Sequence, residues 1–225
     1  MKMKKQSYTY NQDDVDKILK ELKENPPKEV NVQSMGGYNN IVAKYMIARA
    51  GLLHRAFELA VSANNCLQNK EIVSSILLIR ALFETSSVFG FIHYKIDNFI
   101  KTKNIKDFDT DITNILYGTR NGTTANKSIN ILTIIDKINK EIPEYRSLYD
   151  RLSEYAHPNF TGTSLLYGSP QHNMVKFETT ESNNHIIDQS INDLYLSINA
   201  LKTFIIMNTD IIEKFVDIVN ELDEQ

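Results

Sequence analysis

Residues 72–92 read IVSSILLIRALFETSSVFGFI, and this stretch is the most apolar in the chain. Arg80 and Glu84 are the two formal charges between Glu71 and Lys95. A helix that is apolar on nearly every side is normally buried in the middle of a bundle. The stretch therefore predicts a central helix over about residues 70–100. Its two charges and its serines argue against a membrane-spanning segment.

The flanking sequence shows the spacing of further helices, because apolar residues recur at intervals of three and four. This periodicity predicts helices at residues 13–23, 39–67, 109–117, 127–140, 143–156 and 185–222. Pro143 suits a first helical position, and Pro158 disfavours the helical conformation at His157 and so ends the preceding helix. The last helix would be roughly 55 Å long, enough to cover the bundle or to reach another subunit.

A short β-hairpin is predicted before the last helix. Residues 163–167 and 173–178 alternate in polarity, and Gly168, Ser169 and Pro170 lie between them as a turn. The predicted fold class is all-α, an up-and-down helical bundle with long central helices and this hairpin as an insertion. We expect one domain over 1–225, made of an N-terminal helix and loop (1–38), a bundle core (39–184) and a C-terminal helix (185–225).

The composition is that of an ordinary globular protein, with 225 residues, 42% hydrophobic and 24% charged. The net charge of −3 gives no global positive field that would draw the chain to nucleic acid or to an anionic membrane. A lone cysteine, Cys66, excludes an internal disulfide and fits a reducing compartment. The first five residues are basic, but no apolar segment follows, so no signal peptide is expected. We therefore expect a cytoplasmic protein, and the abundance of Asn, Ile and Lys suggests a bacterial source.

Arg80 and Glu84 form the first candidate site. They are four residues apart on one helical face and can form an ion pair. Charges in an apolar helix must be paired and hydrogen-bonded, since an unpaired one costs several kcal/mol. Two interpretations follow: a polar tie between core helices, or a pocket in which Arg80 holds an anion or Glu84 acts as a base.

The second candidate site is residues 149–159, which read YDRLSEYAHPN. Tyr149, Ser153 and His157 are spaced by four and share a helical face, with Glu154 close to the histidine. A histidine at a helix C-terminus is stabilised as the cation. An imidazole beside hydroxyls and a carboxylate suits general acid–base chemistry. The alternative is that His157 only caps its own helix.

The pattern RALFE at 80–84, followed by YxxLSEYAHPN at 149–159, resembles uncharacterised bacterial helical proteins and is similar to the HEPN superfamily. Many HEPN proteins are metal-independent ribonucleases of toxin–antitoxin and phage-defence systems, with a motif of arginine, four to six residues, then histidine. Arg151 and His157 match it. The resemblance implies that His157 transfers protons at an RNA phosphodiester while Arg151 steadies the phosphate, in a site formed across a homodimer. In place of the polar residue that usually follows the arginine, this chain has Leu152.

These patterns give one set of candidate residues and leave some alternatives open. The predicted catalytic residues are Arg151 and His157, supported by Ser153 and Glu154, and the predicted binding residues are Arg80, Glu84, Tyr149 and Asn159. Arg49 and His54 also fit the arginine–histidine spacing, although they lie inside a predicted helix. No cofactor is expected. No metal site is expected either, because di-iron bundles repeat Glu-x-x-His and this chain has it once, at residues 154–157.

The predicted function is therefore an RNA-binding protein or metal-independent ribonuclease of a bacterial defence or toxin–antitoxin type. RNA, a cognate antitoxin and a second copy of the chain are its expected partners, and no membrane is. The alternative prediction is a non-catalytic helical module that binds other proteins. In that case Arg80, Glu84 and His157 would form a structural polar network.

Overall fold

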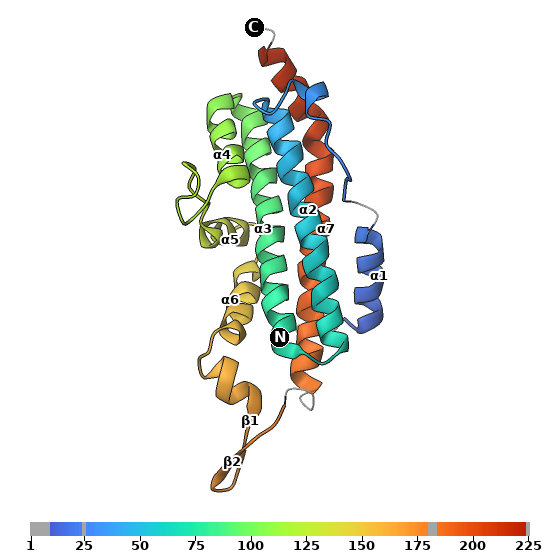
Figure 1. The fold of residues 1–225 in the computed structure, drawn as a ribbon, viewed down its shortest axis with the longest axis vertical. Coiled ribbons are helices and arrows are strands. Elements are labelled where there is room, and N and C mark those ends of the chain that lie inside the picture. The colour runs from blue at the N-terminus through green and yellow to red at the C-terminus, as the bar shows by residue number, and fades with distance from the viewer. Residues whose placement is uncertain (1–9, 24–25, 180–183, 224–225) are drawn as a thin grey trace, which may run out of the picture.

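The computed structural model describes residues 10–23, 26–179 and 184–223. Its centre is formed by long helices α2 (Ile41–Gln68), α3 (Ile72–Thr102) and α7 (Asn184–Asp223), which lie side by side (Figure 1). The chain descends along α2, ascends along α3, descends again through shorter helices and ascends along α7. The expectation that the chain has no signal peptide concerns its first residues, which lie outside the described residues.

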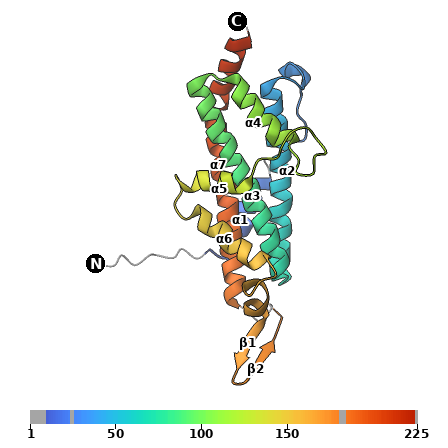
Figure 2. The same cartoon turned by 90° about the vertical axis from the view of Figure 1, so that its left-hand side faces the viewer.

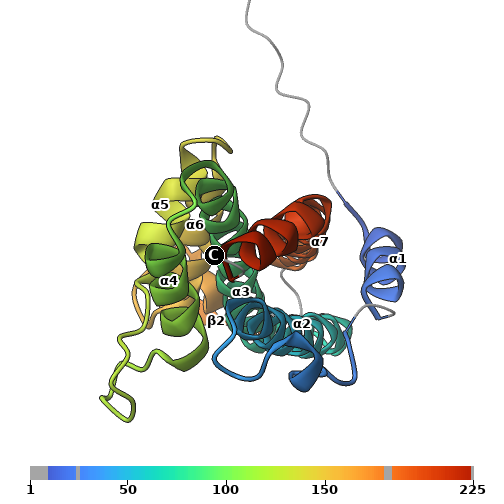
Figure 3. The ribbon, with the colours of Figure 1, turned by 90° about the horizontal axis from the view of Figure 1, so that it is seen from above.

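Shorter elements cover the central helices on two sides. Helices α4 (Ile105–Tyr117), α5 (Ile131–Asn139) and α6 (Tyr145–Ala156) descend along one side of α3 (Figure 2). Helix α1 (Gln12–Lys23) packs on the opposite side, against α7 and α2 (Figure 3). Strands β1 (Gly168–Gln171) and β2 (Met174–Phe177) form an antiparallel hairpin before α7. The prediction of an all-α bundle with this insertion is confirmed.

Helix α3 is buried as its sequence predicts. Ile79, Leu82 and Phe83 are fully enclosed. The buried Ser86 Oγ lies 2.9 Å from the carbonyl of Leu82 in its own helix and 3.2 Å from the carbonyl of Ser197 in α7, so its hydroxyl also reaches a neighbouring helix. Among the described helices, α3 alone is long and apolar enough to cross a membrane. More than half of that apolar window is buried inside the bundle, as in the core helix of a globular fold.

Helices α3 and α7 approach closely at Gly90. A Cβ built on this glycine would lie 2.8 Å from the Phe204 ring of α7, far closer than carbon atoms pack. Beside this contact, Asn208 Nδ2 of α7 donates to the carbonyl of Phe89 at 3.1 Å. The small residue on α3 thus lets an aromatic ring of α7 lie directly on the helix backbone.

Asparagine side chains mark several helix starts. Asn40 Oδ1 accepts from the backbone N–H of Val42 at 2.8 Å and so caps the start of α2. Asn130 caps α5 in the same way, so that helix begins at 131 rather than at the predicted 127. Asn104 caps α4, which begins four residues earlier than predicted.

The two prolines around α6 have different outcomes. Pro158 acts as predicted, because His157 leaves the helix with an extended backbone at ψ 146°. The placement of Pro143 at a first helical position is wrong, since α6 begins at Tyr145. Glu144 precedes it with φ 71°, in the left-handed region, and separates the proline from the helix.

The first predicted strand, at 163–167, is wrong. Residues Thr161–Leu165 form a wide helical turn, with the N–H of Leu165 donating to the carbonyl of Phe160. The strand instead begins at Gly168, where we expected the turn. Asn159 is the physical reason, because its Oδ1 accepts from the N–H of Gly162 at 2.9 Å and holds the chain in a turn. This local bond outweighs the alternating polarity.

We predict opposite effects for two glycine-to-alanine substitutions. Gly90→Ala should lower the free energy of unfolding by about 1–3 kcal/mol, because the added methyl group meets the Phe204 ring. Gly51→Ala is the matched control: Gly51 is exposed on α2, and its Cβ would meet nothing within 4 Å. This change should raise stability by about 0.5–1 kcal/mol through helix propensity. Urea denaturation measures both, and equal effects would contradict the close α3–α7 contact.

Candidate functional site

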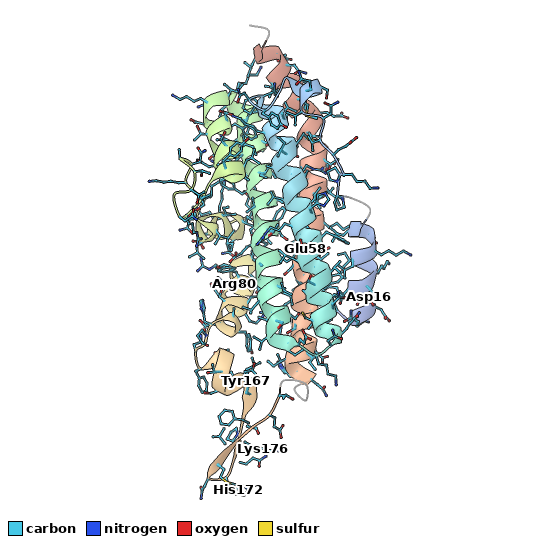
Figure 4. The ribbon with its side chains drawn as sticks, viewed as in Figure 1. Asp16, Glu58, Arg80, Tyr167, His172 and Lys176 are labelled. Carbon is cyan, nitrogen blue, oxygen red and sulfur yellow. The ribbon has the colours of Figure 1, made fainter. Side chains whose placement is uncertain are left out.

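Arg80, Glu84 and Tyr149 meet where α3 contacts α6 (Figure 4 labels Arg80). Arg80 Nη2 donates to Tyr149 Oη at 3.0 Å, and Tyr149 Oη donates to Glu84 Oε1 at 3.2 Å. The guanidinium also lies 3.4 Å from Glu84 Oε1 and 5.4 Å from the centre of the Tyr149 ring. The two candidate sites, which we expected to meet in one pocket, are therefore joined through the tyrosine hydroxyl.

This trio lies in an open groove rather than in the solid core. The groove has a volume of about 370 Å³ and is walled by α3, α5, α6 and the loop that follows α4. The side chains of Arg80 and Glu84 are 27% and 32% exposed, which favours the pocket over the polar tie in the core, the two interpretations that the sequence left open. Arg80 Nε is buried and has no acceptor among the described residues. The guanidinium thus keeps an unused donor.

Arg120 is a second arginine of the groove, and the sequence analysis missed it. It is exposed and forms no ion pair within the described ranges. It belongs to the loop at 118–130, which also carries Lys127 and contains no acidic residue. The stretch without Asp or Glu extends over 112–135, and this is the signal by which Arg120 could have been found. With Arg80 and Glu84, the groove residues have a net positive charge.

Arg151 points away from this groove and ties α6 to α7. Its guanidinium donates two hydrogen bonds to the Asp193 carboxylate, from Nη2 to Oδ1 at 2.6 Å and from Nε to Oδ2 at 3.3 Å. The Asp193 side chain is 5% exposed and also accepts from Gln189 at 2.9 Å. A buried carboxylate needs such a partner. The predicted phosphate-holding residue, whose side chain is 37% exposed, therefore already has a carboxylate partner within the chain.

Tyr145 anchors the start of α6. Its hydroxyl is hydrogen-bonded to Ser87 Oγ of α3 at 2.9 Å, and its ring packs on Phe83. Burial raises the pKa of the Tyr145 hydroxyl well above its ordinary value, so this anchor stays neutral. Tyr145 and Arg151 together hold α6 against both α3 and α7, which gives Tyr149 a defined position.

His157 lies at the open end of α6. Its backbone N–H donates to the carbonyl of Ser153 at 3.2 Å, while its exposed imidazole has no hydrogen bond to any described residue. Beside it, Asn159 Nδ2 donates to Glu154 Oε2 at 2.8 Å. Ser153 Oγ is buried with no partner in the described part of the chain. No hydrogen bond there joins His157 to Arg151, Arg80 or Glu84, so the network predicted with His157 has Tyr149 in its place.

The alternative arginine–histidine pair, Arg49 and His54, has a structural explanation. His54 Nε2 is hydrogen-bonded to the carbonyl of Pro27 at 2.8 Å, which fastens the loop before α2. Within residues 10–23, 26–179 and 184–223, no three His, Cys, Asp or Glu residues are gathered as metal ligands.

Comparison with known proteins identifies no relative. No protein-family model matches the sequence, no curated protein matches it significantly, and no solved structure matches its fold. The function is therefore argued from the groove and its surroundings.

We predict that Arg151→Ala lowers the free energy of unfolding by about 2 kcal/mol, between the small effect of a surface ion pair and the large effect of a fully buried one. The loss arises because Asp193 would keep a buried charge without its partner. Urea denaturation gives the value, and Arg120→Ala is the control that should change it by less than about 0.5 kcal/mol. An Arg151 variant as stable as the wild type would show that the fork with Asp193 does not support the fold.

Proposed function

We propose that this chain is a cytoplasmic RNA-binding protein that holds RNA phosphate groups in the groove between α3, α5 and α6. The observation that carries this proposal is the pair of arginines that line the groove, Arg80 with a side chain 27% exposed and Arg120 with no carboxylate partner among the described residues. Guanidinium groups match the geometry of phosphate oxygens and remain charged at every physiological pH.

Glu84 and Tyr149 position the first arginine. Their oxygens hold Nη2 of Arg80, and the Nε atom is buried, so a ligand contacts the part of the guanidinium that stays exposed in the groove. One carboxylate offsets only one of the two arginines, so an anion is favoured in the groove. This arrangement positions a cation without neutralising the site.

The loop at 118–130 supplies further groups suited to a phosphate backbone. It contains Lys127 and several threonines and asparagines, all of which can donate hydrogen bonds to phosphate oxygens. The exposed side chains of Leu77 and Leu132 border the groove and offer apolar contact to sugars or bases. A local basic and hydroxyl-rich surface supports RNA contacts even though the whole chain has a net charge of −3.

Binding without cleavage is the form of the proposal that the geometry favours. In the ribonuclease interpretation, Arg151 steadies the phosphate, yet here it grips the buried Asp193. His157 lies two helical turns beyond Tyr149, exposed and free to contact an RNA strand that leaves the groove. We therefore assign His157 to binding and Arg151 to the support of α6.

We predict that Arg120→Ala weakens RNA binding about three- to tenfold at low salt and makes the plot of log affinity against log salt less steep by about 0.7, as for one lost phosphate contact. Fluorescence anisotropy with a labelled single-stranded RNA measures both. Lys214→Ala, at an exposed lysine of α7, is the control and should bind as the wild type does. A well-folded wild type that binds no RNA at low salt would overturn the proposal and leave the non-catalytic protein-interaction module.

A cleavage assay in EDTA separates binding from catalysis. The wild type, His157→Ala and Arg151→Ala should all leave the RNA intact over hours under conditions in which they bind it. Cleavage by the wild type that resists EDTA and is lost in His157→Ala would instead establish a metal-independent ribonuclease.

A further inference from the structure

The β-hairpin projects beyond the end of the bundle, away from the central helices (Figures 1 and 4). Its two strands pair with each other, Gly168 opposite Phe177 and Gln171 opposite Met174. Within the described ranges no third strand joins this sheet. A two-stranded hairpin with both edges open is marginally stable in water. The hairpin therefore gains stability from any surface that completes it.

Apolar side chains gather on the hairpin and on the turn before it. Five large ones are between 53% and 73% exposed, namely Phe160, Leu165, Met174, Val175 and Phe177. At roughly 100 Å² each they present about 500 Å² of apolar surface, a large part of the roughly 800 Å² that each partner of a standard interface buries. An exposed apolar area of this size is at the upper end of what a monomer shows and is often functional.

The two edges of the hairpin are not equivalent. Strand β1 contains Pro170, which has no N–H to donate, so its edge is a poor template for another strand. Strand β2 contains no proline or glycine. The N–H of Glu178 donates to the carbonyl of Tyr167, the residue before β1. In an antiparallel pair, the backbone groups of successive residues point alternately toward and away from the partner strand, so those of Val175 and Phe177 face outward. The open edge of β2 can therefore accept a strand.

We infer that β2 pairs antiparallel with β2 of a second copy of this chain, with Phe177 opposite the same residue of the copy. In this register Lys176 lies opposite Glu178 of the copy, and the two-fold symmetry repeats that pair. Lys176 forms an ion pair with Glu178 of its own strand. In the symmetric pairing each of these residues lies next to two opposite charges, one on its own strand and one on the copy, and this charge complementarity selects a second copy as the occupant.

Neighbouring registers are less favourable. A pairing centred on residue 176 places two lysines opposite each other, which is destabilising. A pairing centred on residue 175 places Lys176 opposite Met174 and loses both ion pairs. The register centred on Phe177 combines an aromatic pair with two opposite-charge pairs, and its central residues have outward backbone groups. The interface uses no residue of the Arg80 groove, so dimerisation and RNA binding can be tested separately.

Charge reversal with rescue tests this pairing in the full-length protein. Sedimentation velocity at micromolar concentrations should show a dimer for the wild type. Lys176→Glu and Glu178→Lys should each weaken the dimer at least tenfold, because each places like charges opposite each other. The double variant Lys176→Glu/Glu178→Lys should restore it. A monomeric wild type would overturn the inference, as would a dimer that both single variants leave unchanged.

Disulfide trapping provides a second readout that does not depend on the strength of the dimer. In a Cys66→Ser background, Phe177→Cys should form a covalent dimer on mild oxidation, since opposed residues of an antiparallel pair lie within disulfide reach. Gln171→Cys, on β1, is the control and should stay monomeric. Far-UV circular dichroism should show unchanged helix content in every variant, because the hairpin lies outside the core. Equal trapping at both positions would contradict the β2 register.

Discussion

The structure depends on one constraint, the need to keep the apolar surface of α3 away from water on every side. Each buried aliphatic or aromatic side chain contributes about 1.5–3 kcal/mol, and α3 carries more of them than a single neighbouring helix can cover. The solution is to surround it, with α2 and α7 packed along its length and α5 and α6 on its remaining side. Gly90 and the buried serines allow the close approach, because they add little volume and the serine hydroxyls find partners on the neighbouring helices.

The candidate site follows from the way in which short helices complete this cover. Helices α5 and α6 are 9 and 12 residues long, whereas α3 has 31 residues, so they cover its side in pieces. The groove opens between these pieces and the loop after α4, at the point where α3 carries its two charges. Arg80 and Glu84 can therefore remain partly hydrated while Tyr149 fixes their geometry. The same arrangement that seals the core thus leaves a positively charged groove on its surface.

The two proposed binding surfaces lie at different places on the bundle. The groove faces outward beside α3, and the hairpin extends from the end of the bundle where α7 begins. The resemblance to HEPN proteins assigns Arg151 to catalysis. Here it instead connects α6 to α7 and so holds in place the helix that carries Tyr149 of the groove. In a chain with a net charge of −3, the proposed phosphate site is thus local, and it is separate from the apolar hairpin edge that we propose pairs with a second copy.

The helical architecture was determined by the sequence alone, because apolar spacing and asparagine caps are local signals. These signals located most helices, the end of α6 before Pro158 and the presence of a hairpin before the last helix. Arg80, Glu84 and Tyr149 were also identified from the sequence, as polar residues in apolar surroundings. The tertiary structure decided which of them meet and how exposed they are. It also decided that Arg151 pairs with Asp193, which is 42 residues away in the chain, and that Arg120 lines the groove. Such pairings depend on how helices distant in sequence pack, and no local pattern encodes them.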